Sequence, residues 1–239
     1  MYFQLDNITK KYGDFALSIP NLQISRGAIF GLVGNNGAGK TTFLRLCLDL
    51  IQADSGKVLS NNMNVAKNEN WKKYTGSYLD EGFLIDFLTP EEYFDFVGSL
   101  HGMTEQDIKK SLSRFKQLFN GNILGQNKYI RDMSTGNKNK VGIAAAMLFN
   151  PEVILLDEPF ANLDPTSRKI LNNLLIESNQ ERNTTIIVSS HDIANVADLC
   201  SIIAILEEGQ IVRDIKTSDK TYKELQNYFE IEKLESSKI

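Results

Sequence analysis

The chain has 239 residues, a formal net charge of -4 and 42% hydrophobic residues. That length suits one large α/β domain, or a core with a smaller appended lobe, and the acidic balance argues against a nucleic-acid partner, which needs a basic surface. No stretch approaches the roughly 20 apolar residues of a membrane helix, and no N-terminal signal sequence is visible. Cys47 and Cys200 lie in apolar runs without metal-ligand spacing. We interpret both as core residues of a reduced, cytosolic protein.

The N-terminal stretch predicts short antiparallel strands. Apolar residues alternate over 2–9 and 15–19, and a third short run, 22–24, follows Pro20. This alternation is typical of strands with one solvated face. Tyr12 lies in the turn between the first two runs, where its position alone favours an ordinary half-buried tyrosine over a platform for a stacked base.

A buried strand, a glycine-rich turn and a helix follow one another from Ala28. Gly34–Thr41 fits G-x-x-x-x-G-K-[ST], the P-loop pattern. Backbone N–H groups and the helix dipole make such a turn an anion site, Lys40 would reach the β- and γ-phosphates, and the Thr41 hydroxyl would bind Mg²⁺. The predicted nucleotide-binding residues of this loop are Asn35, Asn36, Gly37, Ala38, Gly39, Lys40, Thr41 and Thr42.

The middle of the chain changes from strand patterns to helical ones. Residues 57–59 and 77–79 predict strands, with a surface loop or short helix over 61–70 between them. From 82 to 150 the apolar spacing is helical, which indicates a helical lobe inserted into the α/β core. Helix starts are expected at Pro90, near Thr104 and after Ser134. The second helix is expected to continue through Ile108, Leu112, Phe115 and Leu118. His101, between two of these helices, is interpreted as a surface residue rather than a ligand.

Two buried strands are expected to end in polar side chains. The apolar run 153–156 leads directly into Asp157 and Glu158, and the run 184–190 leads into His191. Open α/β sheets hold ligands at the carboxyl ends of their strands. These three side chains are therefore candidates for the phosphate site.

The C-terminal part predicts a hairpin and an amphipathic tail. Runs 201–206 and 211–215 flank Glu208-Gly209, which reads as a turn. Residues 216–239 include Tyr222, Leu225, Tyr228 and Phe229 in an amphipathic pattern. The pattern indicates no function for the tail.

In this order the motifs resemble the ATP-binding cassette family, specifically a single nucleotide-binding subunit of an ABC transporter, over residues 12–215. The resemblance implies an α/β P-loop NTPase core, with a mostly parallel sheet and an antiparallel β subdomain, plus an inserted helical lobe. Residues 1–239 would form one ATP-binding domain. Its parts would be the core (1–81 and 151–215), the lobe (82–150) and the tail (216–239).

The same resemblance implies roles for individual residues. Tyr12 matches the aromatic that stacks on adenine, which overrides the preference from position alone. Met133–Asn137 looks like a variant of the Leu-Ser-Gly-Gly-Gln signature, whose Ser134 and Gly136 would touch a γ-phosphate. The family's glutamine, in the loop that enters the lobe, is replaced by Asp80, and Asp164 matches an interface aspartate. The implied catalytic residues are Lys40, Glu158 and His191, and the implied Mg²⁺ ligands are Thr41, Asp157 and Asp80.

The function implied by the resemblance is ATP hydrolysis that powers a separate membrane permease. Two cassettes, identical or different, would close head-to-tail around two ATP molecules with Mg²⁺. The chain would be cytoplasmic, on the inner face of the cell membrane, and exporters are weakly favoured over importers. Asp80 cannot donate a hydrogen bond when ionised, so coupling at its loop is less certain than in the family at large.

Two alternatives are a soluble ABC-type ATPase of repair or translation and a sensor that binds ATP without hydrolysing it. The first usually has long coiled coils or two cassettes, and this chain has one cassette and no heptad run. Phosphate release by the purified chain, alone and with membranes, separates these alternatives from the transporter. A P-loop GTPase is disfavoured because no Asn-Lys-x-Asp segment follows a strand end; Asn137–Lys140 only resembles one and lies at a helix start.

Overall fold

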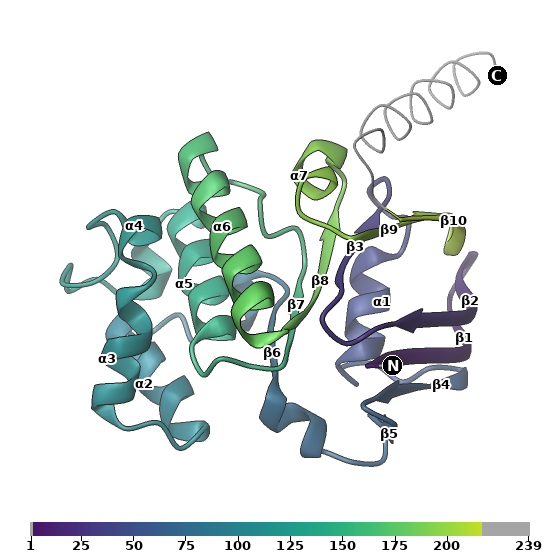
Figure 1. Ribbon diagram of the computed structural model, residues 1–239, viewed down its shortest axis with the longest axis horizontal. Helices are drawn as coiled ribbons and strands as arrows, with labels where there is room; N and C mark the ends of the chain where they lie inside the picture. Colours follow the sequence, from purple (N-terminus) through teal and green to yellow (C-terminus); the bar gives the residue numbers. More distant parts are fainter. Residues whose placement is uncertain (1, 217–239) are drawn as a thin grey trace.

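The computed structural model describes residues 2–216, so the predicted tail lies outside the described part of the chain. Strands of the described residues join in one 10-stranded sheet, in the order β5-β4-β1-β2-β10-β9-β3-β8-β7-β6 (Figure 1). The strands are β1 (Phe3–Tyr12), β2 (Phe15–Ile24), β3 (Ile29–Val33), β4 (Ser55–Ser60), β5 (Met63–Asn64), β6 (Thr75–Tyr78), β7 (Val153–Leu156), β8 (Thr185–Ser190), β9 (Ile202–Glu207) and β10 (Gln210–Lys216). The α-helices are α1 (Lys40–Cys47), α2 (Pro90–Leu100), α3 (Glu105–Ser113), α4 (Lys116–Phe119), α5 (Thr135–Met147), α6 (Pro165–Arg182) and α7 (Ile193–Ala197). Short 3-10 helices cover Asn70–Tyr74, Glu81–Phe83 and Ile130–Asp132.

One half of the sheet is parallel. Strands β6, β7, β8, β3 and β9 pair in parallel in that order. Every residue of β3, β7 and β8 is buried, as continuous Val, Ile and Leu runs predict for strands covered on both faces. Their carboxyl ends consequently meet at one edge, where the polar residues were expected.

The other half is antiparallel, and it corrects one expectation. Strand β1 pairs antiparallel with β2 and β4, but β2 continues through Pro20 instead of breaking into two runs. The register skips the pair Asn7 and Pro20, and Asn7 has a left-handed φ of 49°. On its other side β2 pairs with β10 only at Ser18. The missing N–H of Pro20 therefore falls where the ladder is already irregular.

The sheet curls around α1, which lies against both halves. Phe43, Leu44 and Cys47 of α1 belong to one buried cluster with residues of β1, β2, β3 and β9. A second cluster covers the other face of the parallel strands and contains the apolar residues of α5, α6 and α7. The P-loop helix is thus held between the two halves, and both cysteines lie in the core, as expected.

The helices between β6 and β7 follow the expected order with one exception. Thr89 caps α2 and Thr104 caps α3, each in a capping box with an acid three residues later. The second predicted helix is not continuous, because α3 ends at Ser113 and α4 begins at Lys116. Arg114, in the break, instead donates hydrogen bonds to the carbonyl of Met147 and to Asn150, at the end of α5.

Within residues 2–216, none of the helices is both long and apolar enough to cross a membrane. The hairpin predicted near the C-terminus is present as β9 and β10. Its turn uses Glu208 and Gly209, with φ values of 44° and 78°, the backbone twist that two-residue hairpins prefer.

Candidate nucleotide site

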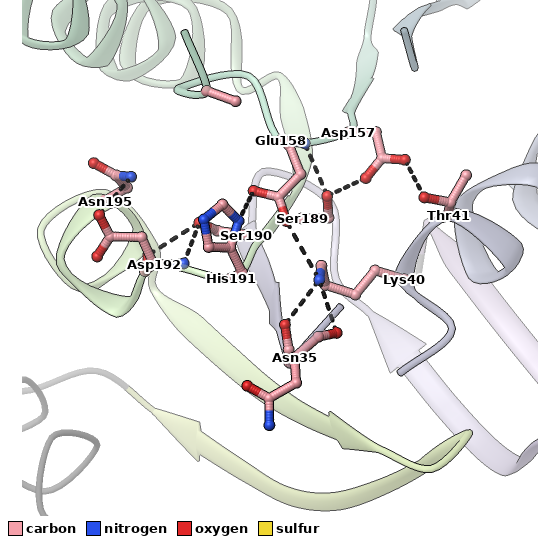
Figure 2. Close-up of polar contacts among 12 residues, drawn as sticks. Asn35, Lys40, Thr41, Asp157, Glu158, Ser189, Ser190, His191, Asp192 and Asn195 are labelled. Atoms are coloured by element: carbon pink, nitrogen blue, oxygen red, sulfur yellow. Dashed lines mark hydrogen bonds and ion pairs between the residues drawn. The ribbon is translucent and has the colours of Figure 1, made fainter. Parts of the chain in front are cut away.

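The candidate site residues follow the ends of three neighbouring strands and lie at one edge of the sheet (Figure 2). The P-loop follows β3, Asp157 and Glu158 follow β7, and His191 follows β8. Since β8 lies between β3 and β7, these segments converge although they are far apart in the sequence. The structure therefore brings Lys40, Thr41, Asp157, Glu158 and His191 together as predicted.

The P-loop depends on glycine where its backbone turns and where neighbours are close. Gly37 and Gly39 have φ values of 85° and 109°, and Gly39 is the N-cap of α1. A side chain at Gly34 would place its Cβ 2.2 Å from the carbonyl oxygen of Leu206. Strand β9 thus supports the loop from behind, and the loop residues Asn35–Gly37 remain exposed.

Lys40 is the central cation of the site. Its side chain is 7% exposed, and its Nζ donates to the carbonyl oxygens of Gly34 at 2.8 Å and Asn35 at 3.2 Å. The same Nζ lies 3.3 Å from Oε1 of Glu158, which makes an ion pair between the P-loop and the segment that follows β7. A buried ammonium held by the loop itself suits the recognition of a phosphate oxygen.

Thr41 and Asp157 form the pair of oxygens closest to the helix N-terminus. The Thr41 hydroxyl donates to Oδ2 of Asp157 at 2.5 Å. Burial raises the pKa of the Asp157 carboxyl, while hydrogen bonds from Ser189 and Thr41 oppose the rise. Among residues 2–216 no group of three or more His, Cys, Asp and Glu side chains could hold a metal. A hydroxyl with one carboxylate fits Mg²⁺, which keeps waters and uses substrate phosphates as further ligands.

Glu158 has an unusual backbone and two charged neighbours. Its φ is 47°, in the left-handed region that residues with a Cβ rarely adopt. One carboxylate oxygen faces Lys40, and the other lies 2.9 Å from Nδ1 of His191 (Figure 2). His191 is exposed over 54% of its side chain, so its ring can reach a bound molecule.

Ser189 belongs to the site although the motifs did not point to it. It is fully buried on β8, accepts a hydrogen bond from the backbone N–H of Glu158 at 2.9 Å, and donates to Oδ1 of Asp157. The available signal was the change from Val188 to two serines at the end of a buried apolar strand. Polar residues there need partners.

A cavity of about 870 Å³ opens beside the P-loop. The β1–β2 turn, the P-loop and the β9–β10 hairpin line it, through Asp14–Ala16, Asn35–Ala38, Leu206–Glu208, Gln210 and Val212. Tyr12 precedes this turn, is 48% exposed and lies under the Lys10 ammonium, which is 5.4 Å from its ring centroid. The Tyr12 ring is thus partly exposed, shortly before the turn that lines the cavity.

Two predicted groups lie apart from this cluster. Ser134 caps α5 through Asn137, and a Cβ at Gly136 would lie 2.6 Å from the carbonyl oxygen of Asn162. None of the hydrogen bonds among residues 2–216 joins Ser134 to the P-loop. Asp80 follows β6 at the same sheet edge, but its carboxylate accepts from the backbone N–H of Gly82 at 2.7 Å instead of contacting Thr41 or Asp157.

A family model described as "ABC transporter" matches residues 17–161, more than half of the chain. The chain belongs to the ABC transporter family. It is 34% identical over 219 residues to an ABC transporter ATP-binding protein of Methanocaldococcus jannaschii, with 90% of this chain and 78% of that protein covered. It is 30% identical over 223 residues to the bacitracin transport ATP-binding protein of Enterococcus faecalis, with 90% and 70% covered.

Solved structures agree with this assignment. The ATP-binding subunit of an ABC transporter superimposes with a TM-score of 0.82 at 23% identity, covering 93% of each chain, which shows the fold. A dimeric ATP-binding cassette bound to ADP and Pi, in a post-hydrolysis state, has a TM-score of 0.78 at 26% identity, covering 90% of this chain and 99% of that one. The ABC chain described here is accordingly an α/β P-loop ATPase.

Proposed function

We propose that this ABC ATPase binds ATP with Mg²⁺ at the P-loop and drives a separate membrane permease by closing onto a second cassette. The observation that carries the proposal is the convergence of Lys40, Glu158 and His191 beside the Thr41–Asp157 pair. Phosphoryl transfer needs mostly positioning and charge stabilisation, and these groups supply a fixed cation, a base and metal ligands.

The residues divide the work as follows. The exposed amides of Asn35–Gly37 hold phosphate oxygens, and Lys40 turns from its carbonyl partners towards the γ-phosphate. Thr41 and Asp157 would hold Mg²⁺, which supplies charge neutralisation at the phosphates. Glu158 accepts the proton of the attacking water, and His191, 2.9 Å from Glu158, orients that water.

The second cassette would complete the site. Ser134 and Gly136 begin α5 in a separate region from the P-loop, and the Ser134 side chain already caps the helix. A helix N-terminus suits a phosphate of a nucleotide bound to another copy. The solved dimeric cassette supports this proposal of a head-to-tail dimer. Whether the partner is identical or different would follow from purifying the assembled transporter.

An apolar hollow of about 280 Å³ supports docking to a permease on the cytoplasmic face of the membrane. It lies between the end of α1, the segment 70–74 and the loop after β6, and its exposed members include Leu50 and Phe83, each 49% exposed. Apolar side chains grouped on a surface favour a partner. Asp80 is in the same loop as Phe83, so a docked partner would be next to the nucleotide edge.

The direction of transport stays a prediction. One relative is named for methionine import, from Carboxydothermus hydrogenoformans, at 30% identity over 204 residues with 83% of this chain and 60% of that protein covered. Another is named for bacitracin transport. The weak preference for an exporter can be tested by measuring cargo movement in oriented vesicles that hold the assembled transporter.

The central test is Glu158→Gln, which keeps the shape of the side chain but removes the base. Phosphate release should fall by about 100-fold or more, while ATP binding persists and a dimer accumulates with ATP on size exclusion. Glu152→Gln is the matched control, because Glu152 precedes the same strand at its opposite end and should leave turnover unchanged. Unaltered turnover by Glu158→Gln would refute the assignment of the base.

A further inference from the structure

The buried hydroxyl of Ser189 links the two acids that follow β7. Its Oγ accepts from the backbone N–H of Glu158 at 2.9 Å and donates to Oδ1 of Asp157 (Figure 2). Both hydrogen-bonding directions of one hydroxyl are therefore used within the site. The side chain is fully buried, so water cannot replace either bond.

The backbone of Glu158 depends on such bonds more than an ordinary residue does. Its φ of 47° is unfavourable for a residue with a Cβ, and it persists only when its surroundings hold it. The N–H of Glu158 is held by Ser189, and its carbonyl accepts from the N–H of Ala161 at 3.0 Å. Ser189 thus supplies one of the two anchors that direct the Glu158 carboxylate towards Lys40 and His191.

The same hydroxyl fixes the orientation of Asp157. One oxygen of this carboxylate accepts from Ser189 and the other from Thr41. With both oxygens bonded, rotation of the carboxylate is restricted, and Oδ2 stays on Thr41. Strand pairing sets this geometry, since Leu156 pairs with Val188 and Asp157 and Ser189 follow them directly.

We propose that Ser189 is a positioning residue for ATP hydrolysis, which holds the base-bearing backbone of Glu158 and the carboxylate of Asp157 in their productive arrangement. The inference rests on the proposed function of Glu158. A misplaced base loses rate without losing affinity, because the P-loop contacts to the nucleotide remain. A merely structural serine would instead affect stability and leave the rate of folded protein unchanged.

The test compares Ser189→Ala with Thr185→Val in the purified full-length chain. Thr185 is a matched control: it lies on the same strand, is fully buried, and its hydroxyl likewise accepts a backbone N–H, that of Gly27, at 2.9 Å. We expect Ser189→Ala to lower kcat about 10- to 100-fold, with the Kd for trinitrophenyl-ATP, measured without Mg²⁺, unchanged. Thr185→Val should lower the unfolding midpoint but not kcat.

Two further variants separate the hydroxyl from the volume of the side chain. Ser189→Cys keeps the size with a weak donor and should behave like Ser189→Ala, whereas Ser189→Thr keeps the hydroxyl and should restore kcat. Equal kcat values for Ser189→Ala, Ser189→Cys and Thr185→Val would overturn the role of Ser189. In that case, loss of activity in Glu158→Gln would still support the proposed function. A wild-type chain without ATPase activity would overturn both the proposed function and the role of Ser189.

Discussion

Left-handed backbone among the described residues has two different origins. Most non-glycine residues with positive φ among those described are asparagines, such as Asn150 and Asn183, which tolerate this region. Glu158 has no such tolerance, and its conformation is held by Ser189 and by the turn to Ala161. The backbone of Glu158 is thus maintained by neighbouring residues rather than by its own conformational preference.

The backbone of Gly39 gives a prediction about a single residue. Its φ of 109° lies outside the region that alanine tolerates, and a Cβ would lie 2.8 Å from Cζ of Phe15. At Gly13 the φ is 56° and a Cβ meets no atom within 4 Å. Gly39→Ala should therefore reduce the free energy of unfolding by about 1–3 kcal/mol more than Gly13→Ala, measured by urea denaturation. Equal losses would show that the P-loop backbone can relax.

The parts of the site that local sequence motifs encode were predictable from the sequence. The glycines with Lys40 and Thr41, and the acids after a buried strand, are local patterns, and the structure brings them together. Ser189 was not predictable in this way, because its role follows from pairing between β7 and β8. The left-handed φ of Glu158 likewise depends on bonds from distant segments.

Among the helices, the N-terminal caps were predictable from the sequence, whereas the break between α3 and α4 was not. The starts of α2 and α5 follow from Thr89-Pro90 and Ser134, whose side chains bond the first turns. The break between α3 and α4 has no Gly or Pro to indicate it. It coincides with Arg114, a partly buried guanidinium. Burial lowers its pKa to about 10, and it donates hydrogen bonds to the end of α5. A tertiary contact has overridden the helical periodicity there.

His101 makes the end of α2 sensitive to pH. Its ring stacks on Phe149, with centroids 3.4 Å apart, and burial lowers its pKa from the ordinary value of 6.5. The unfolded chain therefore binds a proton more readily than the native one, so this contribution to stability is present above pH 6.5 and is lost as the pH falls below it. His101→Phe keeps the stack without titrating.

The measurement is urea denaturation of both chains at pH 7.5 and 5.5. Wild type should lose more stability than His101→Phe between the two values, because other titrating groups are common to both. An identical loss in the two chains would assign the acid sensitivity to groups other than His101.

For the whole molecule, the sequence predicts that the strands exist more readily than it predicts their order in the sheet. The parallel core and antiparallel strands follow from burial patterns, but the single pair between Ser18 and Gln210 that joins β2 to β10 has no local signal. The division into a core and an inserted lobe stays a prediction. One buried cluster contains residues of both α2–α5 and the parallel strands, so the two parts share a core.

The apolar hollow yields a prediction for the assembled transporter. Phe83→Asp should leave ATPase activity and stability of the purified chain unchanged but weaken sedimentation with permease-containing membrane vesicles by about 10-fold or more, given the burial energy of one aromatic side chain. Leu100→Asp is the control, since Leu100 is 68% exposed but does not line the hollow. Equal sedimentation of the two variants would exclude this surface.

A series of hydrogen bonds connects the strand before Asp80 to the turn that contains Glu158. The Tyr78 hydroxyl donates to Oδ1 of Asn139 at 2.7 Å, Nδ2 of Asn139 donates to the carbonyl of Ala161 at 2.8 Å, and the N–H of Ala161 bonds Glu158. Gly142, one helical turn from Asn139, leaves room for the Tyr78 ring against α5. A tilt of α5 relative to either neighbour would break one of these bonds and leave a partly buried polar atom without its partner. By these bonds α5 joins the strand that leads into Asp80 to the backbone of Glu158, so the three segments resist moving independently.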